Sequence, residues 1–150
     1  AELTTCWTSG DCPNVTWASV SDPDRGSVYE ISLAENAVYA GVWLFNITDG
    51  GINLSDYSAG ALKFDVKLIN AGNNSEGYLV TTQCGWPCAS SPINTGVVGG
   101  SDWETVSIPV SDLVSNGLDL SKVNIGFNIY PVIEQQAGVV FRLDNVRWSR

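Results

Sequence analysis

The sequence predicts an all-β chain that folds as an antiparallel β-sandwich of the jelly-roll kind. Three observations lead to this fold class. Apolar and polar residues alternate with a period of two, turn-forming residues separate the alternating segments, and the helical candidates are single turns. At 150 residues the chain has the usual length of one domain, so we expect a single β-sandwich over residues 1–150.

The expected strands follow from the alternation. In the segment 61–70, the apolar Leu62 and Phe64 alternate with the polar Lys63 and Asp65, which is typical of a half-buried strand. The same reasoning places further strands at 27–34, 37–45, 77–84, 103–110, 124–131 and 139–148.

Turn chemistry separates these segments. The runs 22–26 (DPDRG) and 71–74 (AGNN) are rich in Pro, Gly, Asn and Asp, the residues that tight turns favour. One helical turn is expected at 111–117 (SDLVSNG), with Ser111 as its N-cap.

The four cysteines form two pairs that are close in the sequence. Three connectivities are possible, and we favour Cys6–Cys12 and Cys84–Cys88 because each pair is local. A zinc site is the alternative, but the C-x5-C and C-x3-C spacings differ from paired C-x-x-C motifs and the chain has no His. Disulfides indicate an oxidising compartment, so we expect a secreted or extracellular protein.

The formal charge of −9, with only seven Lys and Arg, argues against nucleic acid and anionic membranes as partners. No apolar run approaches the roughly 20 residues that span a bilayer. We expect a monomer.

Catalysis is constrained by the absence of His, which excludes Ser-His and Cys-His nucleophile pairs. A glycosidase that uses two carboxylates would need only Asp or Glu. The acids, however, lie mostly at turns, as Asp49, Asp56 and Asp102 do. We therefore expect no catalytic residues and no enzyme activity.

A binding face is predicted from the segment 37–45. If Val42 and Leu44 face the core, Tyr39 and Trp43 lie together on the other face, and exposed rings in one place indicate a binding surface. Rings among planar polar groups suit the C–H faces and hydroxyls of sugars. A solvated outer face is the alternative. The other strands add these polar residues to the same patch: Lys63, Asp65, Lys67, Thr81, Gln83, Asn128, Tyr130 and Arg142.

Two cysteine-flanked segments each hold a tryptophan. In 83–88 (QCGWPC), a short covalent loop around Trp86 would let the ring bind a flexible polymer with little loss of freedom, whereas the alternative is that Trp86 covers a core edge. Trp7 in 6–12 (CWTSGDC) is a second candidate, with packing of the terminal segment as its alternative. Trp17, Trp103 and Trp148 are expected to serve packing.

Acidic turns also suggest calcium, which takes six to eight oxygen ligands. The candidates are Asp22 and Asp24 in SDPDRG and Asp144 in LDNVRW, although no EF-hand spacing is present.

The C-terminal two-thirds of the chain resembles a known family pattern. The segments 54–70 (LSDYSAGALKFDVKLIN), 101–113 (SDWETVSIPVSDL), 118–131 (LDLSKVNIGFNIYP) and 138–148 (GVVFRLDNVRW) are similar to successive strands of jelly-roll, galactose-binding-like carbohydrate-binding modules. Families four, eleven and twenty-two are the most similar, and the C-terminal jelly-roll domains of bacterial exo-β-glucanases share the pattern.

The resemblance implies a concave sheet face that binds a β-glucan chain through Trp and Tyr, with Tyr39 and Trp43 on a strand that resembles a cleft-lining one. It also implies a structural calcium, because Asp144 matches the Asp of the family's last strand. The family's N-terminal acidic ligand has no clear match unless Glu2 or Glu30 serves, and the two cysteine loops are not part of the general pattern.

We therefore predict a noncatalytic carbohydrate-binding module that binds a polysaccharide or oligosaccharide, a β-glucan or another plant or algal glycan. It would target the catalytic domain of a parent glycosidase to that glycan. The alternatives are a structural appendage that completes a glycosidase active site and a small glycan-cleaving enzyme.

Overall fold

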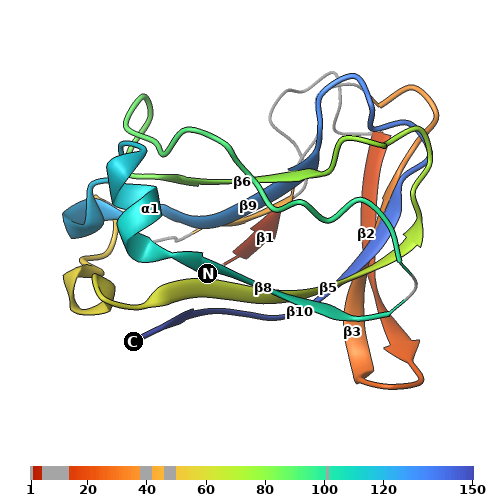
Figure 1. Ribbon diagram of the computed structural model, residues 1–150, viewed down its shortest axis with the longest axis horizontal. Coiled ribbons are helices and arrows are strands. Elements are labelled where there is room, and N and C mark those ends of the chain that lie inside the picture. The colour runs from red at the N-terminus through yellow and green to blue at the C-terminus, as the bar shows by residue number, and fades with distance from the viewer. Residues whose placement is uncertain (1, 5–13, 38–41, 46–49, 101) are drawn as a thin grey trace.

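The computed structural model describes residues 2–4, 14–37, 42–45, 50–100 and 102–150, and shows two five-stranded sheets packed face to face (Figure 1). This arrangement confirms the predicted β-sandwich. The strands are β1 (Glu2–Thr4), β2 (Val15–Asp22), β3 (Gly26–Leu33), β4 (Val42–Phe45), β5 (Ala61–Asn70), β6 (Tyr78–Gln83), β7 (Ile93–Asn94), β8 (Glu104–Pro109), β9 (Ile125–Pro131) and β10 (Val140–Ser149). The helical turns are η2 (Ser55–Tyr57), α1 (Val110–Ser115) and η3 (Leu120–Lys122).

Each sheet is antiparallel throughout its described pairs. Sheet A has the strand order β1-β4-β9-β6-β7, and sheet B has the order β2-β3-β10-β5-β8. Strands that are neighbours in the sequence are therefore often in different sheets. For example, β5 lies in sheet B and β6, which follows the 71–74 turn, lies in sheet A. The sheet to which a strand belongs decides which outer face of the sandwich its outward side chains reach.

The core lies between the two sheets, where the inward residues of each strand meet. Phe64 on β5 and Phe127 on β9 pack edge to face across the sandwich, with ring centroids 5.0 Å apart. Both rings are fully buried, as are Ile31, Val80 and Phe141 around them. Burying an aliphatic or aromatic side chain of this size contributes about 1.5–3 kcal/mol, so the alternation that predicted the strands also stabilises the sandwich.

Two elements differ from expectation. The sequence analysis did not predict β2, which lies at the edge of sheet B and is buried only at its two ends, so its alternation is weak. Helix α1 begins at Val110, inside the predicted strand 103–110, and its N-cap is Pro109 with no side-chain cap bond. The prediction that Ser111 caps this helix is wrong, because strand β8 runs directly into the helix and Ser111 already lies in its first turn.

The turn between β2 and β3 forms at 23–25, as the sequence predicted, with Gly26 in the left-handed region at φ 75°. Within the described residues, no helix reaches the length and apolarity needed to cross a membrane.

Candidate functional site

A cleft of about 710 Å³ opens on the outer side of sheet A, along β6 and β9. This volume is within the usual range of small-molecule sites, about 300–1,000 Å³. Thr81 pairs with Asn128 in the sheet, and paired residues of an antiparallel sheet share a face, so both side chains reach the cleft floor. The described lining residues are Thr81, Gln83, Trp86, Pro87, Ala89, Ser90, Ser91, Pro92, Ile125, Asn128 and Tyr130.

Trp86 lies at the rim of this cleft on a loop that is closed covalently. Cys84 and Cys88 form the predicted disulfide, and the Cys84 amide donates to the Cys88 carbonyl at 2.8 Å. The Gly85 amide donates to Asn124 Oδ1 at 2.8 Å, which ties the loop to the start of β9. The ring of Trp86 is nevertheless 76% exposed, so the loop holds an indole out into solvent rather than covering the core.

The base of the loop is a buried hydroxyl pair. Thr82 accepts the Ser90 amide on its carbonyl at 2.9 Å, and the two side-chain hydroxyls are also 2.9 Å apart. Both residues are buried, so the two ends of the loop are fixed to each other as well as to β9. The backbone at Trp86 is therefore held in place before any ligand arrives, which reduces the entropy lost on binding.

Asn128 supplies an unusual group to the cleft floor. Its Nδ2 donates to Thr81 Oγ1 at 3.0 Å, whereas its Oδ1 is buried and has no hydrogen-bond partner among the described residues. An unpaired buried acceptor costs about 1–3 kcal/mol, so a donor supplied from the cleft would be stabilised here.

The described lining of the cleft holds no charged side chain and combines apolar groups with a smaller polar part. Its polar groups are hydroxyls and amides, which both donate and accept hydrogen bonds. Burial raises the pKa of the Tyr130 phenol, so this group stays neutral at physiological pH. The described lining also holds no Asp or Glu pair of the kind that glycoside hydrolysis uses.

Five of the residues predicted for the binding surface therefore meet in one site: Thr81, Gln83, Trp86, Asn128 and Tyr130. The backbone of Trp43 on β4 pairs with Asn128, so the row Thr81, Asn128, Trp43 runs across sheet A. Tyr39 and Trp7 lie outside the described residues, as does the predicted disulfide Cys6–Cys12.

Asp65 and Arg142 do not belong to this cleft, and the prediction of one continuous patch is wrong. Asp65 lies on β5 and Arg142 on β10, both in sheet B, whereas Gln83 and Asn128 lie in sheet A. The inward neighbours Phe64 and Leu143 are core residues, so Asp65 and Arg142 point to the outer face of sheet B. Alternation identified the outward residues of each strand correctly, but the two sets are on opposite faces of the sandwich.

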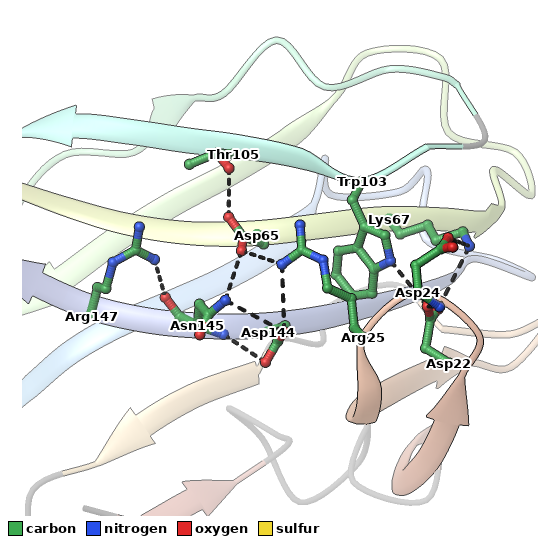
Figure 2. A network of polar contacts seen from close by, with 10 residues as sticks. All are labelled: Asp22, Asp24, Arg25, Asp65, Lys67, Trp103, Thr105, Asp144, Asn145 and Arg147. Carbon is green, nitrogen blue, oxygen red and sulfur yellow. Dashed lines mark hydrogen bonds and ion pairs between the residues drawn. The ribbon is translucent and has the colours of Figure 1, made fainter.

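On that opposite face, charged side chains form a network (Figure 2). The carboxylate of Asp22 lies 2.7 Å from Arg142 Nη1 and 3.6 Å from Lys67 Nζ. Burial opposes the charge of Asp22, but hydrogen bonds from Arg142, the Asp24 amide and Trp103, together with the Lys67 charge, outweigh it. They hold the pKa of Asp22 well below its usual range.

The second half of the network surrounds Arg25, which sits between two carboxylates in Figure 2. Arg25 Nη1 donates to Asp65 Oδ2 at 2.6 Å and lies 3.6 Å from Asp144 Oδ2. Burial opposes ionisation of Asp65 too, yet hydrogen bonds from Asn145, Thr105 and Arg25 and the Arg25 charge lower its pKa. The Arg25 guanidinium also lies 4.8 Å from the centroid of the Trp103 ring.

This geometry bears on the calcium candidates Asp22, Asp24 and Asp144. The carboxylate of Asp22 is occupied by basic groups, and no cluster of three His, Cys, Asp or Glu suited to a metal occurs among the described residues. The three acids therefore do not fit a shared calcium cage. Asp144 keeps a partly exposed carboxylate, and calcium near it stays a prediction.

The segment 89–92 (ASSP), which was not predicted as part of the site, completes one side of the cleft. The isolated bridge between Gln83 and Ala89 brings it there. The available signal was its position just after Cys88, because a closed loop returns the residues that follow it to the strand that precedes it. Trp103 and Trp148 serve packing as predicted, with Trp148 Nε1 donating to the Gly126 carbonyl at 2.9 Å.

Solved structures share the fold at low sequence identity. The structure titled extra C-terminal domain of exo-1,3/1,4-beta-glucanase, from a Pseudoalteromonas species, is 14% identical, with a TM-score of 0.65 over 97% of this chain and 75% of that chain. The exo-1,3/1,4-beta-glucanase itself gives 14% identity and a TM-score of 0.68 over 96% of this chain, which spans only 18% of that enzyme.

A family 11 carbohydrate-binding module from Clostridium thermocellum, solved in complex with a beta-1,3-1,4-mixed-linked tetrasaccharide, is 16% identical. Its TM-score is 0.58, over 97% of this chain and 85% of that module. No curated protein sequence matches the chain. The model of the Exop_C family, described as galactose-binding domain-like, matches residues 38–148. Since this match covers well over half of the sequence, the chain belongs to the Exop_C family of galactose-binding-like domains.

Proposed function

We propose that this chain is a noncatalytic carbohydrate-binding module that binds a neutral polysaccharide in the cleft of sheet A. One observation carries the proposal: the disulfide-closed loop presents an exposed Trp86 at the rim of a cleft whose described lining combines apolar groups with hydroxyls and amides and holds no charged side chain. An indole covers the C–H face of a sugar ring, while hydroxyls and amides below it bond to the sugar hydroxyls. The fold similarity to modules from glycosidases supports the same class of ligand.

The proposed glycan is a β-glucan or another plant or algal polysaccharide, bound by a secreted monomer. The biological role would be to hold a linked glycoside hydrolase near its substrate. Tethering two binding elements raises the effective concentration of one at the other, to millimolar levels for short linkers. The disulfide is compatible with an oxidising, extracellular setting.

A second candidate is a structural appendage that packs on a glycosidase and completes its active site. It is favoured by one fact, that the chain spans only 18% of the exo-glucanase whose C-terminal part it resembles. An appendage would need no affinity of its own, which distinguishes it from a binding module.

The test is calorimetric titration with a β-1,3-1,4-mixed-linked tetrasaccharide and with an agarose-derived tetrasaccharide, followed by an assay for released sugar. We expect binding without turnover. Trp86→Ala should weaken binding by about 1–3 kcal/mol, as loss of a central aromatic anchor does. Trp86→Phe should retain most of the affinity because it keeps a ring at the rim.

Ile69→Ala is the matched control, because Ile69 is 44% exposed but lies on β5 in the other sheet. It should leave affinity unchanged. Equal affinity in the wild type and in folded Trp86→Ala would remove this cleft as the binding site. No affinity for either glycan would favour the appendage, and released sugar would favour an enzyme.

A further inference from the structure

A second aromatic site lies on the β2–β3 hairpin. Tyr29 on β3 pairs with Ser19 on β2 and with Leu143 on β10. Leu143 belongs to the core, and paired residues share a face, so Tyr29 and Ser19 point to the inner face of sheet B. Ile31, two residues along β3, is fully buried on this face, whereas Tyr29 is 46% exposed. The inner face of the sheet is thus open to solvent at the hairpin.

Trp17 extends this open surface. It pairs with Ile31 on the same face and is 42% exposed. Its ring packs against Tyr29 with centroids 5.3 Å apart and an interplanar angle of 80°. A packing role was expected for Trp17, but the ring it packs against is itself half-exposed. Two adjacent half-exposed rings form a contiguous apolar patch, and such patches often mark binding sites.

Polar groups lie next to the rings. A pocket of about 300 Å³ is lined by Tyr29 together with Ser19 and Ser27. Asp144 and Asn145 also border it, but their side chains contact Arg25 and Asp65 in the network on the outer face of sheet B. The Ser19 and Ser27 hydroxyls are 2.7 Å apart and exposed, so one hydrogen and several lone pairs remain for a ligand. Leu143, Phe127 and Val146 form part of the apolar floor.

The chemistry of the described lining favours a sugar. The described lining holds no Lys or Arg, so an anionic ligand would meet no base in the pocket. Aromatic rings beside serine hydroxyls match the mixed apolar and hydroxyl surface of a neutral saccharide. A protein partner would instead have to desolvate the serines without a saccharide's many hydroxyls to pair them.

We propose that the β2–β3 hairpin carries a second glycan-binding site, in which Trp17 and Tyr29 contact a sugar ring and Ser19 and Ser27 bind its hydroxyls. The site shares no described lining residue with the cleft of sheet A. Figure 1 shows the β2–β3 hairpin at one end of the long axis and the loop after β6, beside α1, at the other. Two separated sites would let the domain hold a polysaccharide bivalently. The class of ligand rests on the proposed function.

The test counts sites with the β-1,3-1,4-mixed-linked tetrasaccharide as the probe, in two-dimensional NMR and calorimetric titrations of the whole chain. The wild type should bind two equivalents. Trp86→Ala and the double variant Trp17→Ala/Tyr29→Ala should each bind one, and the triple variant none. For a mixed-linkage β-glucan polymer, loss of either site should weaken apparent affinity at least tenfold, since bivalent binding commonly adds about 10²-fold or more.

Two controls address folding. Trp17→Phe/Tyr29→Phe keeps both rings and should keep the second equivalent. Thr16→Ala alters the exposed neighbour of Trp17 on the opposite face of β2 and should change nothing. Each variant is first compared with the wild type by its melting curve.

One equivalent in the wild type that is lost only in Trp86→Ala would overturn the second site and leave the proposed function intact. One equivalent lost only in Trp17→Ala/Tyr29→Ala would instead overturn the cleft and retain the hairpin site. If the two rings are protected from solvent without glycan when the chain is linked to a glycoside hydrolase, the pair is a domain contact, and the second site is likewise overturned.

Discussion

Asp22 is the most strongly perturbed acid described in the molecule, and it fixes the β2–β3 turn to the outer face of sheet B. Its side chain is fully shielded from solvent, and it receives Arg142 from β10, Lys67 from β5 and the indole N–H of Trp103. Removing one partner of a buried charge pair is destabilising because the other partner loses its compensation. The turn is therefore held by charge where the hairpin has few core contacts.

We predict that this carboxylate makes the fold sensitive to acid. The pKa of Asp22 is below its ordinary value of 3.8 in the folded protein, so folding favours the ionised form. Stability from this group is complete above the unfolded-state pKa and is lost as the pH falls below about 4. Asp22→Asn should lower the free energy of unfolding at pH 7 and flatten its decline between about pH 4 and pH 2.

Urea unfolding from pH 2 to pH 7 measures both effects. Asp24→Asn is the matched control, because Asp24 lies in the same turn but its side chain is 70% exposed. The prediction fails if the two variants show the same pH dependence.

The loop after β6 illustrates how an element can carry function. Its disulfide, its internal hydrogen bonds and the bond to Asn124 fix five residues, yet the ring at its tip stays in solvent. A loop that is fixed in this way but buries little apolar surface contributes more to ligand affinity than to the stability of the core.

We predict that Cys84→Ser/Cys88→Ser separates these two contributions. Closing so short a loop constrains the unfolded chain weakly, so the free energy of unfolding should fall by at most about 2 kcal/mol. Glycan affinity should fall as well, because Trp86 must then be ordered on binding. Calorimetry and urea unfolding of the folded variant provide the measurement. Unchanged affinity would show that the disulfide acts as a structural link alone.

At the scale of the whole molecule, the two outer faces are chemically distinct. The cleft of sheet A is uncharged along its described lining, whereas sheet B carries interleaved acids and bases between β5, β10 and the β2–β3 turn. Ligand binding and charge-based stabilisation are thereby placed on different faces. Changes in ionic strength should therefore affect the free energy of unfolding more than the glycan affinity of the cleft.

The predicted calcium belongs to this charged side of the sandwich. We expect one ion near Asp144 that stabilises the native state and takes no part in binding. Adding EDTA should then lower the melting temperature, and excess calcium should restore it, because a ligand that binds only the folded state stabilises it by mass action. Asp144→Asn should abolish the calcium effect, with Asp112→Asn, on the surface of α1, as its control. An unchanged melting curve in EDTA, together with no calcium by elemental analysis, would contradict the prediction.

Much of this architecture was determined by the sequence alone. The alternation of Leu62, Phe64 and Val66 with polar residues placed them in the core, because side chains of a strand point alternately to its two faces. The Cys84–Cys88 loop was equally predictable, since its two ends are four residues apart and its closure needs no distant partner.

Only the tertiary structure decided which outward residues become neighbours. Alternation groups residues within one strand, but the order of strands in a sheet comes from pairing between distant segments. That order placed Asp65 and Arg142 with Asp22 and Arg25, and separated them from Gln83 and Asn128. It also placed β2 at a sheet edge and left Trp17 exposed beside Tyr29, because an edge strand has a neighbour on one side only and the opposing sheet leaves this part of its inner face uncovered.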